Sequence, residues 1–157
     1  MSNNKVIIVL LLVAVIFAAS PTFAETTTRN LRIITYVAKA CRVTSITNVA
    51  FSASYDPTDT SPNDSGRGSF TLRCTRNTNY DLFIAGTRQM TNGSNNLDYE
   101  LYREAGRINV WPSASPGVTG TATSNQPVTR DIYGRIPVGQ DVQAGVYFDT
   151  VTITVQY

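Results

Sequence analysis

The sequence predicts an all-β fold, a single β-sandwich, and three observations support this prediction. From Thr28 onward, apolar and polar residues alternate with a period of two rather than 3.6. β-branched and aromatic residues fill the alternating positions, and stretches rich in Gly, Pro, Asn, Ser and Thr separate the alternating segments. No amphipathic helical pattern interrupts them. Several short strands at this spacing in about 130 residues are typical of a sandwich with one core.

The first 24 residues have the pattern of a secretory signal peptide. Lys5 precedes an unbroken apolar run of 14 residues, 6–19, and the segment that ends at Ala24 has small residues at the two positions that a signal peptidase reads. The run is shorter than the roughly 20 residues of a membrane-spanning helix, so a cleaved leader is favoured over a permanent membrane anchor. We expect cleavage after Ala24 and export of the remainder.

The segment that follows, before Cys41, is an extended arm without a turn signal. At about 3.3 Å per residue, Thr28 to Ala40 would span about 40 Å, about twice a typical strand. Its odd positions share parity with Cys41, which should face the core, but its even positions are also fairly apolar, so either face could be the buried one. The odd set is Leu31, Ile33, Thr35 and Val37, and the even set is Ile34, Tyr36, Ala38 and Ala40.

Cys41 and Cys74 are the only cysteines. In the oxidising compartment that an exported protein enters, such a pair is expected to form one disulfide rather than a metal or redox site. A loop of this length corresponds to roughly 3.5 to 4 kcal/mol of denatured-state restriction in the chain-entropy model. We therefore expect the disulfide to have a structural role.

The rest of the chain alternates between expected strands and loops. Each strand places apolar side chains on one face, as half-buried antiparallel strands do. The clearest is the last, in which Val151, Ile153, Val155 and Tyr157 point one way. Nothing after Tyr157 covers its edge, and an uncovered apolar edge promotes aggregation. The expected strands are 68–74, 80–84, 97–101 and 151–157, and the expected loops are 56–66, 91–96 and 112–126.

The composition makes several functions improbable. With 13 basic and 11 acidic residues and no basic run, the chain is not expected to bind nucleic acid. Without histidine it cannot form a Ser-His-Asp or Cys-His nucleophile system or the commonest zinc site. We expect no enzymatic activity, no cofactor and no metal.

Two groups of acidic residues offer alternatives to this expectation, a metal site and an active site. The loop group offers oxygen ligands for calcium, but its spacing fits no EF-hand, and a solvated turn is favoured. The strand pair could imitate the carboxylates of a glycosidase, although an outward-facing polar edge explains it equally well. The loop group is Asp56, Asp59, Asn63 and Asp64, and the strand pair is Asp98 and Glu100.

An ordered set of motifs across the mature chain resembles the spore coat protein U family, which includes subunits of archaic-type chaperone-usher pili. Two departures from the family pattern are local: the segment from Phe51 to Tyr55 is longer and lacks a glycine, and Trp111 is followed by Pro112. The motifs are Cys41-Arg42-Val43, Val49-Ala50-Phe51, Tyr55-Asp56-Pro57, Leu72-Arg73-Cys74-Thr75, Tyr80-Asp81-Leu82, residues 97–102, Trp111, and residues 133–140 and 144–155.

The resemblance implies an immunoglobulin-like sandwich that lacks its final strand. A periplasmic chaperone would hold it open, and an outer-membrane usher would assemble it into a surface pilus as the N-terminal arm of a neighbouring pilin completes the sheet by donor-strand exchange. The implied regions are a signal peptide (1–24), a donor-strand extension (25–40) and the sandwich domain (41–157). The implied sites are the donor residues Leu31, Ile33, Thr35 and Val37, the disulfide Cys41–Cys74, and the accepting edge Val151, Ile153, Val155 and Tyr157.

Other interpretations remain open at this stage. Pattern alone favours an arm that is an ordinary first strand of its own domain. A coat protein of the same fold could insert the arm into its own groove, and a secreted sugar-binding adhesin could use Trp111 and the tyrosines for stacking. Within the pilin interpretation, the place of the subunit in the shaft or at the tip is also open.

Overall fold

The computed structural model describes residues 23–157, so the expected signal peptide lies almost entirely outside the described residues. The described chain falls into two units, the first ending at Thr35 and the second running Tyr36–Tyr157. Residues 23–40 contain no strand, and the first strand begins at Cys41. No helix that could cross a membrane occurs within residues 23–157.

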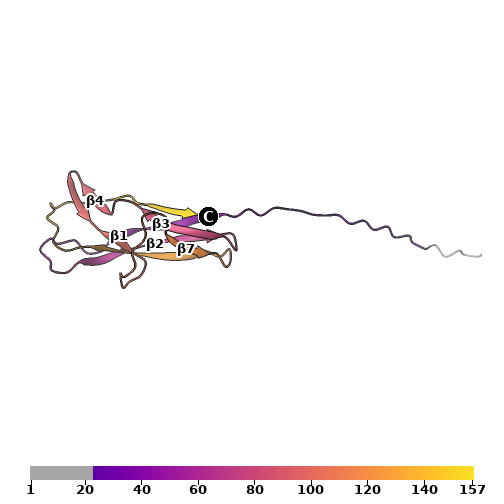
Figure 1. Cartoon of the computed structure of the whole chain (residues 1–157), viewed down its shortest axis with the longest axis horizontal. Coiled ribbons are helices and arrows are strands. Elements are labelled where there is room, and N and C mark those ends of the chain that lie inside the picture. The colour runs from indigo at the N-terminus through magenta and orange to yellow at the C-terminus, as the bar shows by residue number, and fades with distance from the viewer. Residues whose placement is uncertain (1–22) are drawn as a thin grey trace, which may run out of the picture. The chain divides into compact units, whose positions relative to one another are not determined.

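Nine antiparallel strands form the second unit as the structure describes it (Figure 1). The four-stranded sheet has the order β1–β2–β8–β6, the three-stranded sheet has the order β7–β3–β9, and β4 and β5 form a separate hairpin. The all-β prediction is confirmed. The strands are β1 (Cys41–Phe51), β2 (Asn63–Cys74), β3 (Asn79–Ala85), β4 (Gln89–Asn92), β5 (Asn95–Asp98), β6 (Glu100–Tyr102), β7 (Val118–Thr121), β8 (Val128–Ile136) and β9 (Thr152–Gln156).

One hydrophobic core joins the two larger sheets. Phe70 of β2 and Leu101 of β6 are each 1% exposed, as is Leu82 of β3 in the other sheet. Trp111 is 3% exposed and packs against Phe70 with ring centroids 5.6 Å apart. Because its indole is buried, Trp111 cannot offer a stacking surface to a sugar, and the packing supports the core rather than an adhesin pocket.

Two expected elements differ from the structure near the sheet edges. The expected strand 97–101 is interrupted at Tyr99, whose N–H donates to the Arg88 carbonyl oxygen instead of joining the ladder, so β5 and β6 belong to different sheets. The expected loop 112–126 contains β7, which pairs with β3. Its Gly120 lies under the Tyr80 ring, where a Cβ would be 2.6 Å from the phenol oxygen. Packing against an aromatic ring thus requires a glycine that the sequence pattern marked as a turn residue.

The expected loop 56–66 is also shorter than predicted, because β2 already begins at Asn63. Gly66 of β2 lies opposite Gly134 of β8, and the Phe51 ring covers both. A Cβ on Gly66 would approach the Gly134 Cα and the Phe51 ring to 2.7 Å. These glycines therefore allow the end of β1 to pack closely on the sheet.

Asp64, in the same segment, is an ion-pair partner rather than part of a loop open to cations. Its two carboxylate oxygens accept hydrogen bonds from Arg135 Nε at 2.7 Å and Nη2 at 2.8 Å. Arg107 Nε lies 3.3 Å from the same carboxylate, and the Arg107 side chain is only 6% exposed. The bonds from Arg135, followed by the charge of Arg107, hold the pKa of Asp64 below its ordinary value of 3.8.

We expect Asp64→Asn to lower the free energy of unfolding by about 1 kcal/mol at pH 7, since the pair is bidentate but partly exposed. Because the folded-state pKa is lowered, the contribution is present above about pH 4 and is lost as the pH falls through the folded pKa. The melting temperature of the variant should thus change less between pH 7 and pH 3 than that of the wild type. Asp59→Asn, in the exposed part of the same loop, is the control; an equal effect of both variants would contradict the assignment.

Candidate functional site between two edge strands

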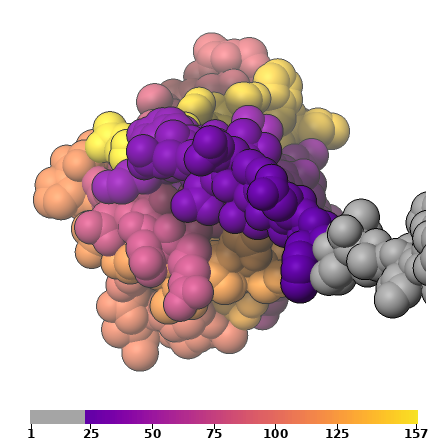
Figure 2. All heavy atoms as spheres, turned by 90° about the vertical axis from the view of Figure 1, so that its right-hand side faces the viewer, coloured from indigo at the N-terminus to yellow at the C-terminus, as the bar shows by residue number. Residues whose placement is uncertain are grey.

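An open groove of about 810 Å³ runs between β1 and β9, the edge strands of the two larger sheets. Among the described strands, β1 pairs only with β2, and β9 pairs only with β3. In the space-filling view, the yellow C-terminal segment borders the violet part of the chain, to which β1 belongs (Figure 2). Each of these strands therefore has one unpaired backbone edge.

Residues of the hydrophobic core contribute to the lining of the groove. Its lining includes Leu101 and Ile132, which are 1% and 4% exposed, and side chains from both edge strands. Ile46 of β1, which also lines it, is 60% exposed. The groove is thus apolar along much of its length and bordered by unpaired backbone. The other apolar lining residues are Val43, Val49, Ala50, Phe51, Met90, Tyr147, Phe148, Val151 and Ile153.

The strand that forms one wall, β9, presents its apolar residues to the core as its alternation suggests. Ile153 lies opposite Ile84 in the β3–β9 ladder, and Val155 lies opposite Leu82. Val151, Ile153 and Val155 are half-buried and pack against the core, and the first two also line the groove. Tyr157 lies just beyond the end of β9 and is 61% exposed.

The lining of the groove also contains a polar pair. The Tyr99 hydroxyl donates to Asp149 Oδ2 at 2.7 Å, and both residues line the groove. Burial, reinforced by the bond to Asp149, raises the pKa of Tyr99 well above its ordinary value of 10.0, so the phenol remains a hydrogen-bond donor at neutral pH. Among the described residues that line the groove, Asp149 is the one carboxylate.

The carboxylates considered for a glycosidase do not form a pair. Glu100 Oε1 lies 3.3 Å from Arg88 Nε, and Asp98 accepts a hydrogen bond from Gln89 at 2.8 Å. Arg88 also donates through Nη2 to the Ile84 carbonyl oxygen at 2.8 Å. Glu100 and Asp98 therefore belong to separate structural contacts on β6 and β5.

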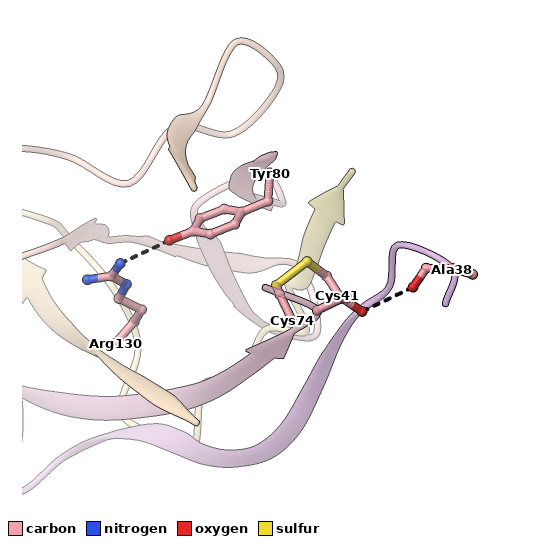
Figure 3. Close-up of a disulfide and its surroundings, with 6 residues drawn as sticks. Ala38, Cys41, Cys74, Tyr80 and Arg130 are labelled. Carbon is pink, nitrogen blue, oxygen red and sulfur yellow. Dashed lines mark hydrogen bonds between the residues drawn. A yellow bond between two sulfur atoms is a disulfide. The ribbon is translucent and has the colours of Figure 1, made fainter. Parts of the chain in front are cut away.

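A disulfide between Cys41 and Cys74 joins β1 to β2 at the start of β1 (Figure 3). Next to it, Thr75 donates from its hydroxyl to the Ala38 carbonyl oxygen at 3.2 Å and from its N–H to that of Ala40 at 2.8 Å. The main chain is thus held to the sandwich from Ala38 onward.

The predicted donor residues have large exposed apolar side chains. Leu31 and Ile33 are 86% and 88% exposed, and Val37 is 73% exposed; Thr35 is exposed too. Side chains of the other parity, such as Tyr36 at 87%, are equally exposed. No described residue of this segment belongs to a strand, so its apolar groups are available for a contact with another surface.

Sequence reasoning did not identify the β1 wall of the groove or the Tyr99–Asp149 pair. The alternation of β1 is weak because register shifts between Val43 and Ser45 and between Thr47 and Ala50 interrupt it. One feature of the sequence could have pointed to Asp149: it shares the parity of Val151 and Ile153, so it is expected on the same face of the chain.

Comparisons with known proteins agree with this fold. The family model described as Spore Coat Protein U domain matches residues 27–154. "Protein U" of Myxococcus xanthus is 28% identical, with 92% of each chain covered. A similar solved structure is the CsuC-CsuE chaperone-tip adhesion subunit pre-assembly complex from archaic chaperone-usher Csu pili of Acinetobacter baumannii, with a TM-score of 0.51 and 19% identity. That match covers 77% of this chain and 40% of the other chain, and it supports the similarity of fold.

Proposed function

The chain belongs to the Spore Coat Protein U domain family, and from this membership we propose that it is a structural, non-enzymatic subunit of a surface pilus. The observation that carries the proposal is the groove between β1 and β9, a largely apolar surface bordered by two unpaired strand edges. An inserted strand would form ladder hydrogen bonds with the edges and cover the apolar floor.

The N-terminal arm has the composition of that inserted strand. Leu31, Ile33, Thr35 and Val37 lie two residues apart, so an extended chain places all four on one face. This face is apolar apart from Thr35, and its side chains are exposed. We infer that these four residues enter the groove of a neighbouring subunit, beside Val151, Ile153, Val155 and Tyr157.

A contact between an arm and a groove on different parts of one subunit is head-to-tail. Such a contact does not close on itself when the rotation between copies does not form a ring, so it produces a filament. A subunit could release the inserted strand only by exposing its core, which makes dissociation slow. The proposed donor-strand exchange therefore accounts for a long-lived polymer.

The same groove implies the partners of assembly. A subunit with an unfilled apolar groove needs protection until an arm arrives, and a periplasmic chaperone that lends a strand would provide it. The solved structure with a similar fold is a chaperone-tip subunit complex, which supports such a partner. The expected signal peptide would direct the chain into the periplasm. We infer that an outer-membrane usher then adds the subunit to a pilus at the cell surface.

The two faces of the arm can be distinguished by a matched pair of substitutions. We expect Ile33→Ala to slow polymer formation by about 5- to 30-fold, since it removes about 1–2 kcal/mol of apolar burial in the groove. Ile34→Ala, on the opposite face, should change the rate less than twofold. Polymerisation from the chaperone-bound subunit, followed by size-exclusion chromatography, measures both rates. A larger effect of Ile34→Ala would assign the other face to the groove.

A further inference from the structure

Two charged residues extend the apolar face of the arm, Arg29 at its N-terminal end and Lys39 at its C-terminal end. Lys39 follows Val37 by two residues, so in an extended chain its side chain shares the face of Leu31, Ile33, Thr35 and Val37. Lys39 is exposed, and it lies between Ala38 and Ala40, whose carbonyl oxygens Thr75 holds. The lysine is therefore positioned where the arm joins the sandwich of its own subunit.

The groove has a carboxylate with the matching periodicity. Asp149 precedes Val151 and Ile153 by steps of two and lines the same groove. The carboxylate is half-buried and held by the Tyr99 hydroxyl at 2.7 Å and by the Thr150 N–H at 2.7 Å. Each oxygen keeps a further lone pair, so the group can accept a bond from an ammonium as well.

From this match we infer that Lys39 of one subunit pairs with Asp149 of the next and thereby sets the register of the inserted arm. The inference rests on the proposed function. An antiparallel arm with Lys39 opposite Asp149 places Val37 opposite Val151, Thr35 opposite Ile153, Ile33 opposite Val155 and Leu31 opposite Tyr157. Each side chain on this face of the arm then lies opposite a side chain of the series from Asp149 to Tyr157. The exposed Tyr157 gains Leu31 as an apolar neighbour.

Other antiparallel alignments lose this complementarity. A shift of two residues one way places the Lys39 ammonium against Val151, and a shift the other way places Val37 against the Asp149 carboxylate. Burying an unpaired charge or leaving a carboxylate against an apolar group is unfavourable. A parallel arm would instead place Arg29 opposite Asp149 and Leu31 opposite Val151, but every ladder in the described strands is antiparallel. Among the antiparallel registers, charge thus selects one from several that are almost equally apolar.

Engineered cross-links in polymers of the full chain can measure this register. We expect the pair Val37→Cys and Val151→Cys to form an intermolecular disulfide, because directly opposed residues have Cβ atoms about 4.5–5.5 Å apart. The pair Val37→Cys and Ile153→Cys reports a two-residue shift, and Leu31→Cys with Val151→Cys reports the parallel arrangement in which Arg29 lies opposite Asp149. Non-reducing gels and mass spectrometry of the cross-linked peptides give the yield of each.

Charge substitutions in the cross-linking background test the role of Lys39. Lys39→Glu and Asp149→Asn should each lower the yield of the Val37–Val151 cross-link by about 3- to 5-fold; the asparagine keeps an oxygen that can accept the Tyr99 bond. The combination of Lys39→Glu with Asp149→Lys should restore the yield to within twofold. Arg32→Glu, of the other arm parity, and Asp141→Lys, an exposed residue of the preceding segment, are controls that should leave the yield unchanged.

Polymers whose Val37–Val151 cross-link is unaffected by Lys39→Glu would overturn the inference and leave the pilus function intact, as would polymers that cross-link mainly through the Val37–Ile153 pair or the Leu31–Val151 pair. If the double-cysteine chain forms the disulfide only within monomers, or if the intact chain forms no polymer, the proposed function and this inference both fail.

Discussion

Deletion of residues 25–37 is expected to abolish polymerisation while leaving a sandwich that a chaperone still binds. The deletion removes the whole proposed donor face and keeps Ala38 and Ala40, whose carbonyl oxygens accept hydrogen bonds from Thr75. The strands, the core and the disulfide all begin at or after Cys41. The truncated subunit should therefore retain its groove and lose only what it gives to its neighbour.

The deletion is best measured on the exported protein, by size analysis with and without co-expressed chaperone. A full-length chain in which Leu31, Ile33 and Val37 are replaced by Ser is the matched control, because it keeps the length of the arm and loses its apolar face. Both variants should fail to polymerise. If the truncated chain misfolds even with chaperone while the intact protein purifies as a stable monomer, the arm completes its own domain and the pilin proposal is wrong.

The double substitution Cys41→Ser and Cys74→Ser is expected to cause the largest loss of stability. The two cysteines are 33 residues apart, which corresponds to roughly 3.5–4 kcal/mol in the chain-entropy model. For a domain of this size the melting temperature should fall by roughly 10–20 °C. Because β1 is an edge strand tied to the rest of the sheet through β2, the loss should also loosen one wall of the groove.

Thermal unfolding of the chaperone-free polymer and of the chaperone complex would measure this effect, and reduction of the wild type should reproduce it. Thr44→Ala, an exposed position on β1 whose hydroxyl bonds the Thr71 carbonyl oxygen at 3.3 Å, is a control for simple loss of a cross-strand contact. A decrease below about 1 kcal/mol for the double variant would mean that β1 is held mainly by its ladder and core contacts.

The regular parts of the fold were predictable because their alternation is uninterrupted. β3 and β9 follow the pattern closely, and their register places Ile84 and Leu82 opposite Ile153 and Val155. Prediction failed where a tertiary contact requires a residue typical of turns. Gly120 lies under the Tyr80 ring in β7, and Gly66 lies under the Phe51 ring in β2. Propensity marks both glycines as loop residues, whereas side-chain packing places them in strands.

For the candidate site, the arm and the β9 wall of the groove could be predicted from the sequence, whereas the β1 wall could not. The exposed apolar series Leu31, Ile33, Thr35 and Val37 and the opposing series from Val151 to Tyr157 are visible as period-two patterns. The second wall was not visible, because register shifts in β1 disturb its alternation. Parity with Val151 and Ile153 was the one feature of Asp149 in the sequence, and the structure added its hydrogen bond from Tyr99 and its place in the lining of the groove.

The sequence by itself determined the all-β class, the pairing of the two cysteines and the alternation of the terminal strand, because each depends on local periodicity or on residue counts. Only the tertiary structure decided that β1 and β9 are edges facing one groove, and that Asp149 lines it together with Tyr99. Which strands become neighbours depends on long-range packing of the two sheets, and that information is spread over the whole core rather than carried by any one segment.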